Sequence, residues 1–317
     1  MLQLPNITAR QALVQPSEIA LNGVALDDRF VDSLTNFSWL RSLLIAGSDV
    51  SDRSLAHIGY MSWLQFLVIS GNPVGADGIR SLARLSGLRM LDASRTHATS
   101  SSFEGATWLR SVQDISIDES HVDGEIWHVL KPATQLTSIS VGGSRVTCES
   151  LANVKHFTQL RSLCLNNLGI SDADLIHLLA LNSLTALYLG ANQITDDGVA
   201  EISRHPRIKV LSIFGTNVTD AGLATIAMLN ALEELFLDNT DVTTSGIQQL
   251  SSMPRLRTLS ITATQISKGV VNVLRKFRTL ERVVLDTSAA EQNRLVPRDT
   301  GGYFECIVAP VHVPPEK

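Results

Sequence analysis

The sequence predicts an α/β solenoid, in which one short parallel strand and one short helix recur along the chain. Residues 184–207 and 208–231 carry the same order of apolar and polar residues twice. Counting from Leu184 in steps of 24 gives starts from residue 16 to residue 280 without insertion or deletion, and the fourth residue of every frame is Ile, Leu or Val. A fixed period of this length is the signature of a stacked repeat protein.

The first part of each repeat predicts a strand. Positions 4 and 6 of the repeat are apolar, as in Leu187 and Leu189, with polar or small residues between them. This period of two is typical of a short strand with one buried face. We therefore expect a parallel sheet of about twelve short strands.

The second part of each repeat predicts a turn and a helix. Position 9 is usually Asn, Ser or Thr, which can bond the backbone of the turn. Aspartates follow where a helix N-cap is expected (Asp52, Asp172, Asp196 and Asp220). Apolar residues at positions 16, 19 and 22 indicate a two-turn helix on the convex side. Residues 88–111 are the weakest copy, so we expect a looser segment there.

The period also predicts the domain organisation. Residues 1–15 are expected to form an N-terminal cap, and residues 16–285 to form eleven full repeats and a partial twelfth. The pattern ends after Leu285, and residues 286–317 are expected to provide a C-terminal cap and a tail, with 303–313 as an extended cap.

The repeat unit resembles a known family. Its first half follows L-x-x-L-x-L-x-x-N (Leu184, Leu187, Leu189, Asn192), and its second half follows T-D-x-G-L, as in residues 219–223. The chain is thus similar to leucine-rich-repeat proteins of the bacterial kind, related in pattern to the cysteine-containing repeats. The resemblance implies a horseshoe and a binding scaffold that holds protein ligands along its concave sheet.

Composition and charge restrict the partner. The formal net charge is −5, with a pI of about 5.9, which argues against a nucleic-acid or anionic-membrane ligand. No apolar run approaches the roughly 18 residues of a membrane span, and no secretory leader is evident, so we expect a cytoplasmic monomer. Three cysteines without C-x-x-C spacing predict neither a disulfide framework nor a zinc site. No cofactor is expected.

The candidate partner site lies on the concave face, where positions 3, 5, 7 and 8 should point. Most of these positions hold Ser, Gly or Asp, but three aromatic residues and a valine gather in neighbouring repeats. Exposed apolar clusters with aromatic residues are typical of interfaces. We expect the site to comprise the apolar group and its acidic rim (Tyr188, Val210, Phe214, Phe236, Asp238 and Glu234).

A second candidate lies nearer the N-terminus. There, Leu44, Phe66, Val68 and Met90 adjoin an acidic patch that could attract a basic partner or a cation (Asp92, Asp114, Asp118 and Glu119). An ordinary solvated acidic face is the alternative interpretation.

Two further hypotheses remain beside the non-enzymatic scaffold. His97 and His121 share position 10 of adjacent repeats, so with Glu119 and nearby carboxylates they could form a metal-dependent or small-ligand site, although spacing fixes no third ligand. The other hypothesis is self-assembly through a poorly capped end or the arginine-rich last repeats. We expect no catalytic residues.

Overall fold

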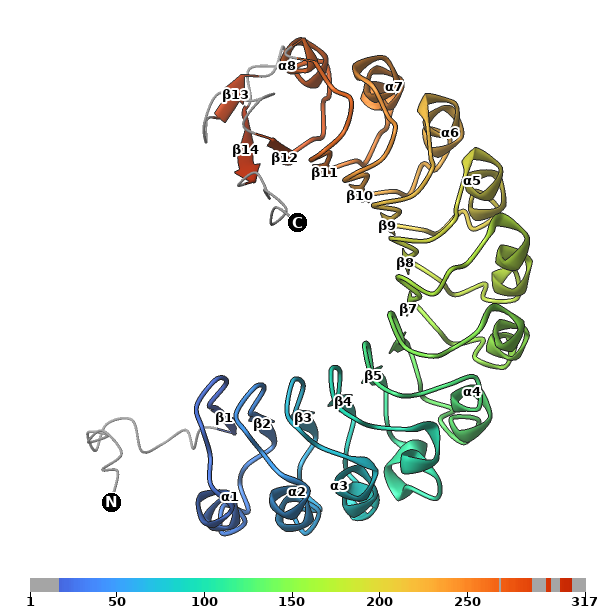
Figure 1. Ribbon diagram of the computed structural model, residues 1–317. Coiled ribbons are helices and arrows are strands. Elements are labelled where there is room, and N and C mark those ends of the chain that lie inside the picture. Colours follow the sequence, from blue (N-terminus) through green and yellow to red (C-terminus); the bar gives the residue numbers. More distant parts are fainter. Residues whose placement is uncertain (1–16, 268, 287–294, 298–302, 310–317) are drawn as a thin grey trace, which may run out of the picture. The chain divides into compact units, whose positions relative to one another are not determined.

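A computed structural model describes residues 17–267, 269–286, 295–297 and 303–309. The chain divides into two compact units between Leu136 and Thr137, and each unit is described by itself. In both units the strands of a parallel sheet run along one side and the helices along the other (Figure 1). The sheet face that the helices leave uncovered is called the open face below.

Unit 1 is the N-terminal unit, and its strands pair in chain order with a constant offset of 24 residues. Its strands are β1 (Glu18–Ala20), β2 (Ser42–Leu44), β3 (Phe66–Val68), β4 (Met90–Asp92) and β5 (Asp114–Ser116). Its α-helices are α1 (Asp28–Leu34), α2 (Asp52–Ile58), α3 (Ala76–Ser81) and α4 (Ile126–Val129). Its 3₁₀ turns are η1 (Leu82–Arg84), η2 (Ser100–Phe103) and η3 (Thr107–Arg110).

Unit 2 continues the pattern with the same offset. Its repeat strands are β6 (Ser138–Ser140), β7 (Ser162–Cys164), β8 (Ala186–Tyr188), β9 (Val210–Ser212), β10 (Glu234–Phe236), β11 (Thr258–Ser260) and β12 (Arg282–Asp286). Its α-helices are α5 (Asp196–Ile202), α6 (Asp220–Ile226), α7 (Thr244–Gln249) and α8 (Val270–Leu274). Its 3₁₀ segments are η4 (Cys148–His156), η5 (Asp172–Leu178) and η6 (Leu250–Ser252).

The predicted strands are confirmed: all twelve begin at the third position of a 24-residue repeat. From the second repeat on, the fourth-position side chains, such as Leu43 and Leu187, are buried, while the flanking positions are mostly half-buried on the open face. The looser segment in residues 88–111 is also observed, as η2 and η3 replace an α-helix there. Trp108 fills the core of this repeat, with its ring edge-on to Phe103 at 6.1 Å between centroids.

Two further strands follow the last repeat strand. β14 (Tyr303–Ala309) pairs parallel with β12, and β13 (Leu295–Pro297) pairs antiparallel with β14. The chain thus extends the sheet within the segment predicted as a C-terminal cap. The predicted N-terminal cap, residues 1–15, lies outside the described residues. Within the described part of the chain, none of the helices combines the length and apolar character that crossing a membrane requires.

The turn after each strand needs a left-handed backbone at position 8. Gly47, Gly71, Gly143 and Gly215 have φ between 56° and 69°. The same position takes positive φ where it is not glycine, for example at Glu119 (φ 50°) and Ala191 (φ 55°). A non-glycine residue costs roughly 1–2 kcal/mol there, so other bonds must hold the turn in place.

A buried asparagine supplies such bonds. The carboxamide oxygen of Asn192 accepts from the backbone N–H groups of Leu168 and Ile170, at 3.0 Å each, in the preceding repeat. Its Nδ2 donates to the carbonyl oxygens of Leu165 and Leu189, at 2.8 and 2.9 Å. Asn192 is 5% exposed. With a longer bond from Nδ2 to the Gly190 carbonyl at 3.3 Å, one side chain therefore bonds five backbone groups of two repeats.

The other residues at position 9 differ in the bonds that they make. Asn72 makes the equivalent bonds in unit 1, to Ser48, Val50, Ile45 and Ile69. The Thr216 hydroxyl, by contrast, donates to the Ile213 carbonyl of its own repeat, at 2.6 Å. The asparagines join repeats, whereas threonine closes its own turn.

The predicted helix caps were wrong by one residue. The N-caps are Ser51, Ser171, Thr195 and Thr219, and each predicted aspartate is the first helical residue. The longer aspartate side chain instead reaches the next repeat. Asp196 accepts from the backbone N–H of Thr219 and of Gly222, both at 2.9 Å, and from the Thr219 hydroxyl at 2.6 Å.

This contact explains the glycine of the T-D-x-G motif. A Cβ atom at Gly222 would overlap the carboxylate of Asp196, and Gly246 stands in the same relation to Asp220. Where position 15 is not glycine, a different cap forms. In η5, Asp174 turns back and accepts from the N–H and hydroxyl of Ser171, at 2.8 and 2.6 Å.

We predict that Asn192→Ala lowers the free energy of unfolding by about 3–5 kcal/mol, because it leaves buried N–H and C=O groups unpaired. Asn192→Thr should cost about half as much, since the threonine hydroxyl can replace some of the bonds that the carboxamide makes to the backbone. Urea denaturation of the full chain measures both. The control is Asn230→Ala, at an exposed asparagine. A loss below about 1 kcal/mol for Asn192→Ala would contradict the role of these bonds.

We also predict an acid-sensitive core at His205. This residue is 7% exposed at a position that is Leu229 in the next repeat, and its burial lowers the pKa of the imidazole below the ordinary value. Between the folded and unfolded pKa values, the unfolded state binds more protons, so the unfolding free energy falls as pH drops below about 6.5.

His205→Leu should therefore reduce the loss of stability between about pH 7.5 and pH 5.5, measured as the change in urea midpoint. His128→Gln, at an exposed histidine, is the control and should retain the loss seen in the unmodified chain. Equal losses in His205→Leu and the unmodified chain would contradict the prediction.

Candidate functional site

The predicted aromatic group lies together on the open face of unit 2. In register, Tyr188 of β8 lies beside Ser212 of β9, which lies beside Phe236 of β10. Two half-buried rings thus flank one small residue, and Ser212 is only 5% exposed. Val210, at the other end of β9, is also half-buried. Tyr188, Val210, Phe214 and Phe236, which lie on neighbouring repeats around Ser212, are called the aromatic patch below.

Phe214 lies over a glycine that the sequence did not single out. A Cβ atom at Gly190 would overlap the Phe214 ring, which shows that the ring rests on the backbone of the preceding repeat. Phe214 is still 36% exposed. The signal was available in the sequence, because both residues occupy position 7 of adjacent repeats and a large residue follows the smallest one.

Two carboxylates border the aromatic patch. Asp238 Oδ1 accepts from Ser260 Oγ at 2.7 Å and from the backbone N–H and hydroxyl of Thr262 at 2.8 and 2.5 Å. All three donors are neutral, and among the described residues no ion pair forms at Asp238. The role predicted for Asp238 as a rim residue therefore coincides with a bond between repeats.

The second carboxylate, Glu234, acts on Tyr188. Burial is the main cause that raises the pKa of the Tyr188 phenol, and the negative charge of Glu234 adds to it. Lys209 pairs with the neighbouring Glu233 and not with Glu234: its Nζ lies 2.9 Å from Glu233 Oε1. The aromatic patch is therefore an apolar surface with negative potential at its edge.

The four acidic residues predicted nearer the N-terminus come from two strands and one turn of unit 1. Asp92 ends β4 and accepts from the backbone N–H of Ser94 at 3.0 Å, and Asp114 begins β5. Asp118 and Glu119 follow in the turn after β5, where Glu119 is exposed at the left-handed position. The apolar residues predicted beside them lie on β2, β3 and β4.

The two predicted histidines do come together. The rings of His97 and His121 have centroids 5.1 Å apart and are tilted by 38°. Both side chains are exposed. In the described ranges, however, no group of three or more His, Cys, Asp or Glu is placed to hold a metal ion.

Comparison with known proteins matches two single repeats. A family model described as "Leucine Rich repeat" matches residues 60–83 and 180–203. A search of curated proteins finds no match to the sequence.

Solved structures share the fold along most of the chain. An internalin (inlF) from Listeria monocytogenes is 17% identical with a TM-score of 0.58, and the alignment covers 84% of this chain and 86% of that one. A leucine-rich-repeat protein from Leptospira interrogans is 16% identical with a TM-score of 0.54, covering 84% and 76%. TLR13, in a complex with ssRNA13, is 20% identical with a TM-score of 0.51, covering 86% and 39%. Identities this low establish the fold alone.

Proposed function

Because this chain is a leucine-rich-repeat protein, similar in fold to bacterial members, we propose that it is a non-enzymatic scaffold that binds a protein or peptide through the aromatic patch of unit 2. The leucine-rich-repeat fold supports a binding scaffold in general. The observation that carries the finer proposal is the group of partly exposed rings on the open face of unit 2, where other strands hold small residues such as Ser140, Ser162 and Ser260. Such patches are typical of interfaces.

The aromatic patch is suited to this role because much of it is already ordered. Tyr188 and Phe236 are half-buried against Ser212, and Phe214 lies on Gly190, so binding would restrict few additional rotamers. The tyrosine combines a large apolar area with a polar hydroxyl, as interface hot spots often do. We infer a protein or peptide rather than a nucleic acid, because the patch is bordered by Glu234 and Asp238 and the chain carries a net charge of −5.

We expect the double variant Phe214→Thr with Phe236→Ser to lose partner binding while it remains folded. The repeats themselves provide these replacements, since position 7 is Thr262 and position 5 is Ser260 in the following repeats. Removing two anchoring rings should weaken binding by at least about 2 kcal/mol, or roughly 30-fold. Affinity capture from lysate of the source cells, with quantitative mass spectrometry, provides the measurement, and circular dichroism checks the fold.

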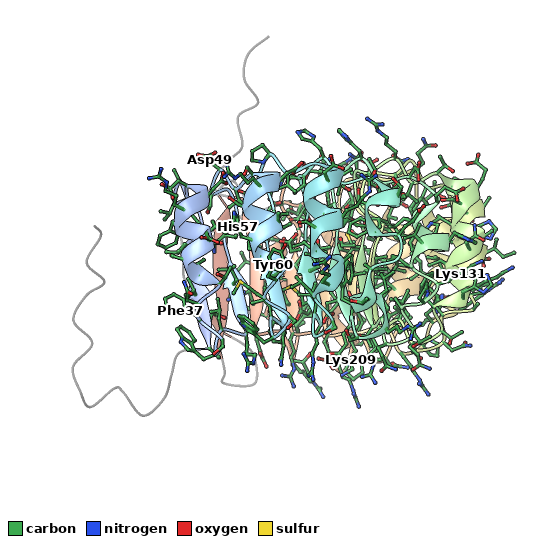
Figure 2. The ribbon with its side chains drawn as sticks, turned by 90° about the horizontal axis from the view of Figure 1, so that it is seen from below. Phe37, Asp49, His57, Tyr60, Lys131 and Lys209 are labelled. Atoms are coloured by element: carbon green, nitrogen blue, oxygen red, sulfur yellow. The ribbon has the colours of Figure 1, made fainter. Side chains whose placement is uncertain are left out.

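The matched control is Tyr60→Ser. Tyr60 is a 67% exposed aromatic residue directly after α2, on the helix side of unit 1 (Figure 2). Its loss should leave capture unchanged. Partners retained at full yield by the double variant would exclude the aromatic patch as the binding surface.

A further inference from the structure

Unit 1 carries a separate groove on its open face. The groove encloses about 350 Å³ over β2, β3 and β4, and its floor is apolar, formed by Leu44, Phe66, Val68 and Met90. Phe66 is 40% exposed, although it begins a strand in the middle of the unit's sheet. From the sequence, these side chains are predicted only to adjoin an acidic patch. In the structure they line one groove.

The strand register places the four side chains in two short rows. Leu44 lies beside Val68, and Phe66 lies beside Met90. In unit 2, β6 and β7 hold small residues at these positions, such as Ser140 and Ser162, whereas β8, β9 and β10 carry the aromatic patch there. Buried apolar area contributes roughly 25 cal/mol per Å², so a ligand that covers the two rows gains affinity without any change in the sheet.

Both rows change from apolar to acidic at the same side of the groove. Val68 is followed in register by Asp92, and Met90 is followed by Asp114. The Asp92 carboxylate bonds the backbone N–H of Ser94, and within the described ranges no basic side chain forms an ion pair with it. Its charge is held in a fixed direction beside the apolar floor.

The opposite side of the groove carries charges of both signs. Glu18 lies there and accepts from the Ser42 hydroxyl at 3.0 Å. Arg41 also lines the groove, but its Nη1 donates to the carbonyl oxygens of Ser38 and Leu40, at 2.8 and 3.1 Å. The guanidinium is therefore held by the turn before β2, and this side of the groove carries one cation and one carboxylate, whereas the side of Asp92 and Asp114 is acidic.

We propose that this groove binds an extended peptide segment in which apolar side chains are followed by an arginine or lysine. The apolar side chains would cover the four floor residues, and the cation would pair with Asp92. Adjacent strands lie about 4.8 Å apart, and alternate residues of an extended peptide lie about 6.6 Å apart. A cation two to four residues after the anchor therefore reaches the acidic side, and the negative chain favours the approach of a basic peptide.

The test uses two synthetic peptides labelled with fluorescein. The basic probe is Ser-Leu-Ser-Phe-Ser-Arg-Ser-Lys, and the acidic probe has Glu in place of Arg and Lys. Fluorescence anisotropy with the full chain should show that the basic probe binds at least about tenfold more tightly. This preference should shrink when salt is raised from about 0.05 M to 0.3 M.

Two variants then assign the binding to the groove. Asp92→Asn keeps an oxygen to accept from Ser94 but removes the charge, so affinity for the basic probe should fall about tenfold. Phe66→Ser should weaken both probes. The matched control is Asp77→Asn on α3, where an exposed carboxylate already pairs with Arg80. This variant should leave the affinity for both probes unchanged.

Three results would overturn the proposal: no binding of the basic probe, equal affinity for both probes, or full affinity in Asp92→Asn and Phe66→Ser. A groove filled by the chain's own residues 1–16 would give the first result. The variant Phe214→Thr with Phe236→Ser should bind the basic probe normally. If this double variant failed to bind the basic probe, the probe's site would lie on the aromatic patch, and the assignment to unit 1 would be overturned.

Discussion

The bonds that cross from one repeat to the next are the constraint on which the rest of this structure depends. A strand of three residues and a helix of two turns leave many backbone groups without partners inside their own repeat. Asn192 satisfies the turn of the preceding repeat, and Asp196 satisfies the cap of the following helix. Each repeat therefore completes its hydrogen bonds only when its neighbours are present, as expected of a one-dimensional stack.

This arrangement leaves the open face free to vary. The residues that join repeats lie in the turns and at the helix caps, and the buried leucines lie between sheet and helices. Positions 3, 5 and 7 are less buried than position 4, so serine, glycine, aspartate or an aromatic residue can occupy them, and some of these residues, such as Asp238, also bond the next repeat. Binding properties can thus change from repeat to repeat without loss of the solenoid.

The two apolar areas of the open faces are built in different ways. In unit 2, large rings lie against small neighbours, Gly190 and Ser212. In unit 1, side chains of medium size lie next to one another and leave a groove over Leu44 and Val68. Carboxylates border both areas, which suits partners that carry positive charge beside apolar side chains.

The order of residues alone determined the repeat frame, the twelve strands and the grouping of Tyr188, Phe214 and Phe236. These features follow from a constant period, because residues 24 apart must lie side by side in a stack. The period does not specify which way a side chain turns. Only the tertiary structure decided that Asp196 leaves the cap to Thr195 and bonds Thr219 instead. It likewise decided that Phe214 rests on Gly190, because such contacts depend on the reach and rotamer of the side chain within the packed neighbouring repeat.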